Sequence, residues 1–358
     1  MSESVLAVDI GGTKFAAALV GPDGDVRRAE RVATPPGGDA ATLWKALDEL
    51  VAGVTGGSPV AGVGIGCGGP MSWPDGAVSP LNMPGWRAFP LRDRLAGRFP
   101  GVPVRIHNDA VCVAVAEHWR GAGRGSANML GMVVSTGVGG GLVLGDRLID
   151  GGSGNAGHIG HIVVDPGGPV CGCGGRGCLE AIARGPGLAA WAVEQGWTPG
   201  RVQGRVTGTG TDEATGGATS GAMSGATGQG AGTAGDAPGP DAPAYVEAAA
   251  ASGRQLALDA AAGDGIALAA MGRAGRALGL AIASATHLCD LDVVTIGGGL
   301  SQAGPLLFDP MEETLRAHAR LDFARRVRVV PASLGQDAGL VGAAALVLAA
   351  DRYWSPGD

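Results

Sequence analysis

The N-terminal part of the chain alternates short apolar runs with glycine-rich turns, which is typical of antiparallel strands. Apolar residues dominate 4–10 and 14–20, and Gly11-Gly12 separates the two runs. A third run over 25–33 follows the turn residues Pro22-Asp23-Gly24. This pattern predicts a β-meander at the start of the chain.

The next segment changes from strand-like to helix-like periodicity and back. Apolar residues recur at helical spacing from Leu43 to Val54, and Asn108 or Asp109 is a suitable N-cap for a later helix. The elements predicted here are a helix over 41–54, strands over 60–66 and 102–106, and a helix over 110–119.

The strand–turn–strand pattern then recurs about 125 residues further along the chain. Strands are predicted over 128–135 and 138–144 around a Thr136-Gly137 turn, with a short third piece over 147–149. The repetition predicts two related α/β domains that face each other.

One segment of the C-terminal half differs in composition from the rest. Residues 207–243 contain no Leu, Ile, Val or aromatic residue, so they cannot bury enough apolar surface to fold. We expect a disordered surface insertion without function. The elements predicted around it are helices over 244–262 and 264–288, strands over 292–296 and 327–330, and an apolar helix over 338–354.

Composition and charge exclude several classes of protein. The chain has 358 residues, 45% of them hydrophobic, which indicates a globular protein of about two domains. A net charge of −7 argues against nucleic acid or an anionic membrane as partner. The uncharged stretches 51–74 and 125–145 are broken by Gly and Pro or Ser, so they indicate strands and turns and not membrane spans. Without a visible secretory signal, we expect a cytoplasmic protein.

Three glycine turns have the composition of phosphate sites. In Asp9-Ile10-Gly11-Gly12-Thr13-Lys14 the glycines expose N–H donors, Thr and Lys add donors, and the acid could hold a metal ion. An ordinary hairpin turn is the alternative. Residues 135–141 and Gly297–Gly299 offer similar turns at strand ends. By contrast, residues 64–69 match GxGxxG, but no helix follows, so we reject a dinucleotide site.

His107-Asn108-Asp109 lies between a predicted strand and a predicted helix. A carboxylate at this position could accept the proton of a substrate hydroxyl, which the adjacent amide could orient. The alternative is that Asn108 and Asp109 only cap the helix.

The most specific local signal is the set His161, Cys171, Cys173 and Cys178, with the spacing H-x9-C-x-C-x4-C. Three thiolates and an imidazole form a closed tetrahedral site for structural zinc. Free cysteines in a glycine-rich loop are the alternative. The metal would also fix the direction of Glu180, whereas His158 could contact substrate, support the site or lie at the surface.

In combination these motifs resemble the ROK family of repressors, open reading frames and kinases, and within it the sugar kinases of glucokinase type. The resemblance covers nearly the whole chain outside 207–243. The segments that carry it are 9–14, Leu81-Asn82-Met83-Pro84-Gly85-Trp86, Asn108-Asp109-Ala110, 136–141, 157–161 and 171–180.

The resemblance implies a hexokinase/actin-like ATPase fold, in which two ribonuclease-H-like α/β domains close a cleft over sugar and ATP. Residues 1–108 with about 338–358 would form the small domain. Residues 109–337 would form the large domain, which carries the zinc loop 161–178 and the insertion 207–243. We also expect a homo-oligomer, either dimer or tetramer.

The resemblance also implies roles for individual residues. Asp109 would be the general base, and the sugar would be bound by Asn82, Asn108, Asp109, His158, His161 and Glu180. ATP and Mg²⁺ would be held by Asp9, Gly11, Gly12, Thr13, Lys14, Thr136 and Gly137, with Gly297, Gly298 and Gly299 on the adenosine side. Structural Zn²⁺ would be bound by His161, Cys171, Cys173 and Cys178.

These roles predict ATP-dependent phosphorylation of a hexose, with glucose converted to glucose 6-phosphate. One departure leaves the sugar open: many sugar kinases of the family have Glu where this chain has His158, so an N-acetylhexosamine such as N-acetylmannosamine or N-acetylglucosamine is an alternative. Polyphosphate could replace ATP. A non-catalytic sugar-binding protein or a transcriptional regulator is also an alternative, although only eight residues precede Asp9 and the net charge is negative.

Overall fold

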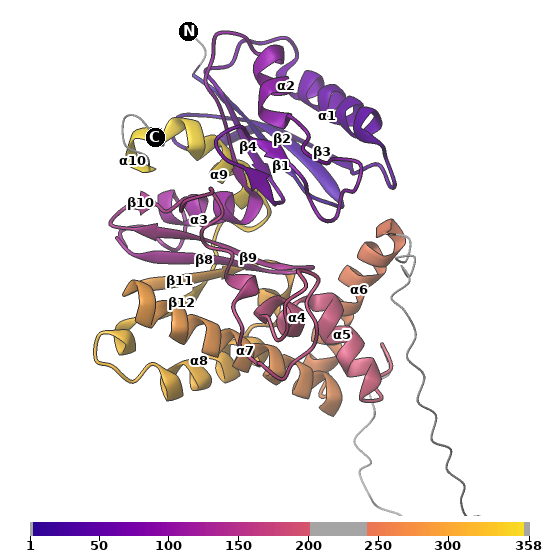
Figure 1. Ribbon diagram of the computed structural model, residues 1–358, viewed down its shortest axis with the longest axis vertical. Helices are drawn as coiled ribbons and strands as arrows, with labels where there is room; N and C mark the ends of the chain where they lie inside the picture. The colour runs from indigo at the N-terminus through magenta and orange to yellow at the C-terminus, as the bar shows by residue number, and fades with distance from the viewer. Residues whose placement is uncertain (1–2, 201–241, 354–358) are drawn as a thin grey trace, which may run out of the picture.

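A computed structural model describes residues 3–200 and 242–353, without the side chains of 242–251 (Figure 1). The insertion predicted over 207–243 lies outside the described residues, except for Ala242 and Pro243.

The first sheet has five strands in the order β3-β2-β1-β4-β7. β1 pairs antiparallel with β2, and β2 with β3, which confirms the predicted meander; β4 and β7 add parallel strands on the other side of β1. A two-stranded hairpin follows β4. The strands are β1 (Val5–Ile10), β2 (Lys14–Val20), β3 (Val26–Ala33), β4 (Val63–Cys67), β7 (Val104–Asn108), and the hairpin strands β5 (Met71–Ser72) and β6 (Ala77–Val78).

The second sheet repeats this topology, with the order β10-β9-β8-β11-β12. Its first three strands are again antiparallel neighbours in chain order, and its last two again pair in parallel. The prediction of two related ribonuclease-H-like α/β units is confirmed. The strands are β8 (Met129–Val134), β9 (Val138–Leu144), β10 (Arg147–Leu148), β11 (Val293–Gly297) and β12 (Arg328–Pro331).

Helices cover the outer face of each sheet, and two further helices lie between the sheets (Figure 1). Each layer has its own apolar core. The outer helices of the first sheet are α1 (Ala40–Thr55) and α2 (Leu91–Arg98). The inner helices are α3 (Asp109–Trp119) and α9 (Ala338–Leu348). The helices beyond the second sheet are α4 (Leu179–Ala183), α5 (Gly185–Glu194), α6 (Ala242–Ala261), α7 (Gly265–Cys289) and α8 (Pro305–His318).

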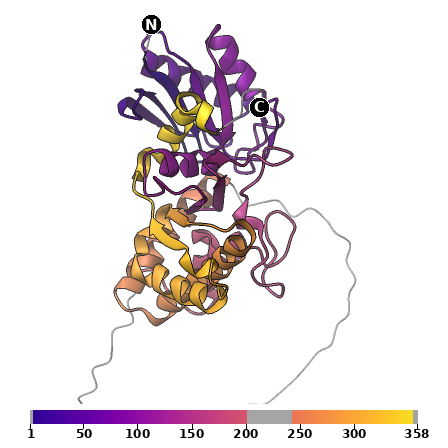
Figure 2. The same ribbon diagram turned by 90° about the vertical axis from the view of Figure 1, so that its left-hand side faces the viewer.

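The two inner helices cross over between the sheets. α3 follows a strand of the first sheet but packs on β8 and β9, whereas α9 follows a strand of the second sheet and packs on β1 and β4. Figure 2 shows the C-terminal segment, in yellow, passing back to the first sheet. Glycine permits this tight packing: a Cβ on Gly64 would meet the Ala343 carbonyl, and one on Gly342 would meet the Cys112 carbonyl.

The prediction of one continuous C-terminal helix over 338–354 is wrong. α9 ends at Leu348, Ala349 leaves the helical conformation, and a short α10 (Ala350–Tyr353) follows. The break turns the buried Tyr353 ring inward, where its hydroxyl lies 2.9 Å from His118 Nδ1. Trp354 lies outside the described residues.

Several elements carry no strong local signal and were not predicted. α2, α4 and α5 are short, and Gly185, Pro186 and Gly187 open α5. α8 contains Pro310 inside the helix, and a proline in the sequence ordinarily predicts the end of a helix.

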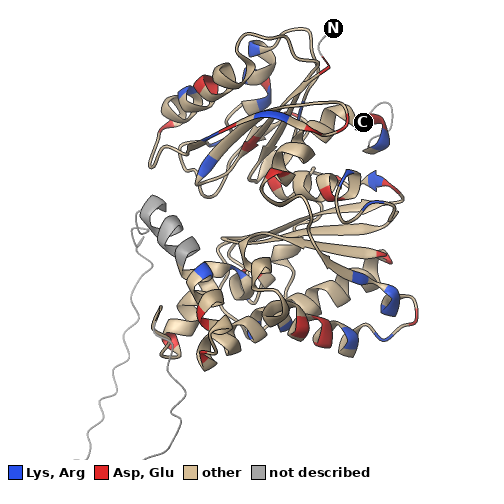
Figure 3. Ribbon diagram, turned by 180° about the vertical axis from the view of Figure 1, so that it is seen from behind, with Lys and Arg blue, Asp and Glu red and all other residues tan. Residues whose placement is uncertain are grey.

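Within residues 3–200 and 242–353, one helix is long and apolar enough to cross a membrane by length and composition, namely α7. It packs against α4, α5, α6 and α8, and 61% of its most apolar window is buried, so it is the core helix of this unit. Basic and acidic residues are interspersed over the outer helices in the view of Figure 3.

Candidate active site

Asn108 and Asp109 lie where β7 ends and α3 begins. Asn108 is the N-cap, and its Oδ1 accepts a hydrogen bond of 3.0 Å from the Ala110 N–H. Asn108 therefore caps the helix, and Asp109 Oδ1 accepts a second hydrogen bond of 2.8 Å from the same N–H. The other carboxylate oxygen, Oδ2, faces Gly68. A methyl group on Gly68 would lie 3.8 Å from Asp109 Oδ2 and 4.0 Å from Asn82 Oδ1.

Burial raises the pKa of Asp109 above its usual value. The hydrogen bond from the Ala110 N–H and the neighbouring His158 lower it in part. A carboxyl group whose pKa moves toward neutrality is a better proton acceptor for a hydroxyl. The environment of Asp109 is therefore suited to a general base.

The first glycine turn lies beside these residues. A methyl group on Gly12 would lie 2.6 Å from Asn82 Cγ, so Asn82 packs directly on the turn. Burial, and then the charge of Asp109, raise the pKa of Asp9 to about 6, while Lys14 and Arg31 lower it in part. The turn, Asn82 and the two acids thus form one group of side chains.

The rest of the first turn meets the segment that enters α9. Lys14 Nζ donates a hydrogen bond of 3.1 Å to Gln336 Oε1, and a methyl group on Gly339 would lie 2.8 Å from Asp9 Cγ. Thr13 is exposed, and Gly11 N–H donates to the Lys14 carbonyl at 3.0 Å. Thr13 and Lys14 therefore lie at the outer side of the turn.

His158 approaches from the loop after β10. Its Nδ1 lies 2.7 Å from the Asn155 carbonyl oxygen, which can only accept, so Nδ1 carries the proton. A methyl group on Gly69 would lie 3.8 Å from His158 Nε2 and 3.2 Å from Asn108 Nδ2. His158 Nε2 and Asn108 Nδ2 therefore both lie beside Gly69, and the His158 ring stacks on His161 with centroids 6.4 Å apart.

The four predicted metal ligands converge. Ligand atoms of His161, Cys171, Cys173 and Cys178 all lie within 4.8 Å of one another. Cys173 Sγ and Cys178 Sγ are 3.8 Å apart, and Cys171 Sγ is 3.7 Å from His161 Nδ1. A tetrahedral zinc with Zn–S bonds of about 2.3 Å requires ligand separations of about 3.8 Å. The donor set and its spacing therefore fit zinc, with Nδ1 as the histidine ligand.

The second and third glycine turns lie together at the ends of β8 and β11. The third turn approaches the second, because a methyl group on Gly299 would lie 3.7 Å from Ser135 Oγ. Glu180 Oε2 accepts a hydrogen bond of 2.9 Å from the Val138 N–H, and a methyl group on Gly137 would lie 2.9 Å from it. Glu180 thus connects the metal loop to the second turn.

Two further contacts connect this turn region with the base. A methyl group on Gly139 would lie 2.7 Å from Ala110 Cβ, at the start of α3. A Cβ on Gly160, in the short 3-10 helix Ile159–His161, would meet the Val138 carbonyl. The strand-end acid, the metal loop and the second glycine turn therefore lie in one region.

Sequence reasoning missed the role of Gly68 and Gly69 in this region. As the sequence predicts, no helix follows residues 64–69 directly: the hairpin β5–β6 follows β4. The same two glycines nevertheless face Asn82, Asp109, Asn108 and His158. The sequence signal that identifies these two positions is a glycine pair at the end of a buried strand. Two other predicted strands carry acids at the same ends.

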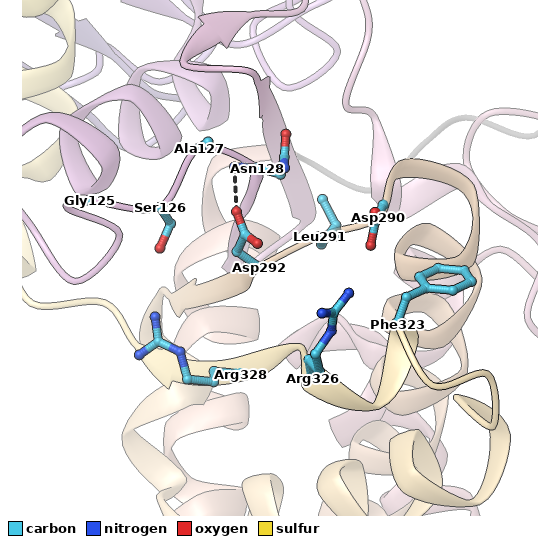
Figure 4. A pocket seen from close by; sticks show the side chains of 10 residues that line it. All are labelled: Gly125, Ser126, Ala127, Asn128, Asp290, Leu291, Asp292, Phe323, Arg326 and Arg328. Atoms are coloured by element: carbon cyan, nitrogen blue, oxygen red, sulfur yellow. Dashed lines mark hydrogen bonds between the residues drawn. The ribbon is translucent and has the colours of Figure 1, made fainter.

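A cavity of about 530 Å³ lies at the N-terminal ends of β8, β11 and β12 (Figure 4). The second and third glycine turns lie at the other ends of β8 and β11. Arg326, Arg328 and Phe323 line one side, and Asp292 accepts a hydrogen bond of 2.9 Å from the Asn128 N–H. None of the predicted site residues lines this cavity.

The duplicated sheets and the acids at their strand ends define a hexokinase/actin-like phosphotransferase fold. The sequence profile of the ROK family matches residues 5–350, so the chain belongs to the ROK family. A glucokinase from Thermotoga maritima is 33% identical over 345 residues, which is 96% of each chain.

Two further relatives bear on the substrate. An N-acetylmannosamine kinase from Escherichia coli is 44% identical over 192 residues, 53% of this chain and 64% of its own length. The crystal structure of a ROK family glucokinase from Streptomyces griseus in complex with glucose and AMPPNP has a TM-score of 0.71 at 31% identity, and covers 96% of this chain and 98% of its own.

Proposed function

We propose that the protein is an ATP-dependent hexose kinase that converts glucose to glucose 6-phosphate. The observation that carries this proposal is the position of Asp109 Oδ2, which faces Gly68 beside Asn82 and the first glycine turn. Glucokinases that match nearly the full length of the chain, and a structural neighbour crystallised with glucose and AMPPNP, support the choice of sugar and nucleotide.

In the proposed reaction Asp109 accepts the proton of the glucose 6-hydroxyl while O6 attacks the γ-phosphorus of ATP. The O6–phosphorus bond forms, the bond from phosphorus to the β,γ-bridging oxygen breaks, and ADP leaves. Asn108 Nδ2 and His158 Nε2 orient the sugar hydroxyls. The N–H groups of the glycine turns at 11–13 and 136–137 hold phosphate oxygens, while Gly297–Gly299 lie on the adenosine side.

Two metal ions belong to this proposal. Asp9 would hold Mg²⁺ or its bound water, which supplies charge neutralisation on the phosphates when it is bound. His161, Cys171, Cys173 and Cys178 would hold zinc with a structural role. Because Nδ1 faces the thiols, Nε2 of His161 remains on the opposite side of the ring, where it can contact the sugar.

We also propose that residues 1–108 with about 338–358 form the smaller domain and 109–337 the larger, with the substrates bound between them. The packing of α9 on β1 and β4, and of α3 on β8 and β9, supports these boundaries. We propose a homo-oligomer in the cytoplasm, whose size light scattering during gel filtration would measure.

N-acetylmannosamine is the second candidate substrate. The N-acetylmannosamine kinases share 43–44% identity with this chain over 192 residues, a higher local value than the glucokinases reach over the full length. In addition, His158 Nε2 can accept a hydrogen bond from an N–H donor, such as the amide of an N-acetyl group.

A coupled assay across glucose, mannose, N-acetylglucosamine and N-acetylmannosamine, with ATP and with polyphosphate, tests the proposal. We expect the highest kcat/KM for glucose with ATP. A higher value for N-acetylmannosamine would select the second candidate. The absence of phosphorylation for every pair would overturn the kinase proposal and favour a sugar-binding protein.

A further inference from the structure

His107 is fully buried at the end of β7, directly before Asn108 and Asp109, and both of its ring nitrogens have partners. The Asn108 N–H lies 2.8 Å from Nδ1, and Asp150 Oδ1 lies 2.8 Å from Nε2. Because a backbone N–H can only donate, Nδ1 is the acceptor and Nε2–H donates to the carboxylate. The imidazole therefore joins the backbone of the Asn108-Asp109 motif to Asp150.

Asp150 belongs to a different part of the fold. It follows β10 of the second sheet, and its side chain is 17% exposed. It begins the loop that carries His158: the Asp150 carbonyl accepts a hydrogen bond of 3.0 Å from the Ala156 N–H, and His158 Nδ1 donates to the Asn155 carbonyl. The His107–Asp150 contact thus joins the strand end of the base to the loop of His158.

Other contacts hold the same loop against the first sheet's hairpin. Trp73 packs on Gly154, where a methyl group would lie 2.8 Å from its Cγ, and the Trp73 ring lies 5.7 Å from the His107 ring. Asn155 Nδ2 lies 3.4 Å from the Met71 carbonyl. Among these contacts the His107–Asp150 pair is the one that also holds the backbone N–H of Asn108, the residue before the base.

We propose that His107 and Asp150 are a positioning pair, which fixes His158 relative to Asn108 and Asp109 and so sets the sugar-binding geometry. The proposal rests on the proposed sugar kinase activity. Neither residue acts on the substrate itself. The pair lies on the sugar side of the site, beside Asn108 and the loop of His158, so its loss should weaken sugar binding and leave nucleotide binding unchanged.

Asp150→Ala is the primary test because Asp150 is not fully buried and its removal is the lesser risk to folding. We expect the sugar KM to rise about tenfold, the equivalent of one hydrogen bond of about 1.4 kcal/mol. The KM for ATP should stay within about twofold of wild type. Asp150→Asn keeps an oxygen that can accept from Nε2–H, so it should restore most of the sugar affinity.

His107→Leu removes both hydrogen bonds of the ring. In the double variant it should not raise the sugar KM beyond the value of Asp150→Ala, because the two residues act as one pair. His118→Gln is the matched control. His118 is a second fully buried histidine with both nitrogens bonded, to Tyr353 and to the Ser126 carbonyl, at the other end of α3. We expect it to lower the melting temperature without changing the sugar KM.

An unchanged sugar KM in Asp150→Ala would overturn the proposal. So would an equal rise in both KM values accompanied by a lower melting temperature, since that result indicates a general loss of structure. Wild-type turnover in the same assay separates the two levels: if the wild type phosphorylates no sugar, the kinase proposal fails and the positioning role fails with it.

Discussion

The negative charge of Asp109, at the start of α3, raises the pKa of Asp9, at the end of β1, beyond the increase that burial alone causes. The resulting pKa of Asp9 is about 6, and the contribution of Asp109 shows that the two carboxyl groups lie close enough to interact. Such a pair is unfavourable for stability unless a cation lies nearby or one carboxylate takes up a proton. A phosphotransferase uses both: a metal ion on the phosphates and a base for the hydroxyl.

Replacing Asp109 by Asn should remove the base and preserve the shape of the site. We expect kcat to fall about 10²- to 10⁴-fold, the usual contribution of general base catalysis. The sugar dissociation constant, measured by calorimetry, should change by less than about threefold, because Asn keeps an oxygen for the Ala110 N–H. Asp93→Asn, an exposed carboxylate, serves as control and should be fully active. Near-normal turnover in Asp109→Asn would contradict the assignment.

Asp9→Asn should make the ligand-free protein more stable at pH 7.5. Because the folded pKa of Asp9 is raised from 3.8 to about 6, the native state retains a proton that the unfolded chain has already released between these values. Ionisation therefore destabilises the native state progressively as the pH rises from about 4 to 6, and the full destabilisation is present above 6. An Asn side chain carries no charge, so Asp9→Asn avoids this destabilisation. The free energy of unfolding should rise by on the order of 1–3 kcal/mol.

Urea unfolding at pH 4 and pH 7.5 measures this effect, and the advantage of Asp9→Asn should nearly vanish at pH 4. Asp25→Asn is the control of opposite sign, because a hydrogen bond from Arg27 lowers the pKa of Asp25. An equal gain at both pH values would show that the charge of Asp9 is not the cause.

The fold could be predicted from the sequence where its signals are local. The two apolar runs around Gly11-Gly12 and the pair around Thr136-Gly137 carry strand and turn signals within a few residues, and both hairpins form as expected. The cluster of His161 with three cysteines was also predictable, since the three cysteines lie within eight residues. The break at Ala349 was not, because alanine favours a helix and the contact between Tyr353 and His118 that accompanies the break joins positions far apart in the sequence.

The candidate site was predictable only in part for the same reason. Gly68 and Gly69 reach Asp109 and His158 because β4 lies between β1 and β7, and that order is set by long-range pairing. His107 lies in β7 of the first sheet, and Asp150, 43 positions away, follows β10 of the second, so no spacing rule connects them. Sequence could place acids and glycines at strand ends, but only the assembled sheets show which ends meet.

Metal removal should destabilise the protein and lower its activity. We expect about one zinc per chain by mass spectrometry of the purified protein, and a fall in melting temperature on the order of 10 °C after chelation. Cys173→Ser, at the exposed ligand, should lose the metal, whereas Cys289→Ser, remote from the cluster, should retain it. A metal-free protein with unchanged melting temperature and activity would exclude the zinc site.

Gly12→Ala should impair the binding of both substrates, because the new methyl group would overlap Asn82. The overlap would displace Asn82 from the sugar and push the glycine turn out of its phosphate-binding conformation. We expect the KM values for sugar and ATP to rise about tenfold each, equivalent to about 1.4 kcal/mol. Adding Asn82→Ala should relieve the clash. The KM for ATP should then return toward that of the wild type, whereas the KM for the sugar should stay high. Gly97→Ala is the control: nothing lies within 4 Å of its Cβ position in α2, and it should be neutral or stabilising by up to about 1 kcal/mol. Recovery of both values, or of neither, would contradict the separate roles of Gly12 and Asn82.

His158→Glu should change both the pH profile and the choice of sugar. His158 lowers the pKa of Asp109, whereas a carboxylate in its place would raise it, so the acid limb of the kcat/KM profile should move to higher pH. An ionised Glu can only accept hydrogen bonds, unlike an imidazole, and it accepts strongly from sugar hydroxyls. The ratio of kcat/KM for glucose over N-acetylmannosamine should therefore rise about tenfold or more. His158→Gln separates the two effects, because it removes the imidazole without adding charge and should leave the acid limb much closer to that of the wild type. If Glu changed the sugar ratio but not the acid limb, His158 would select the sugar without acting on Asp109; if it changed neither, the imidazole would lie outside the sugar site.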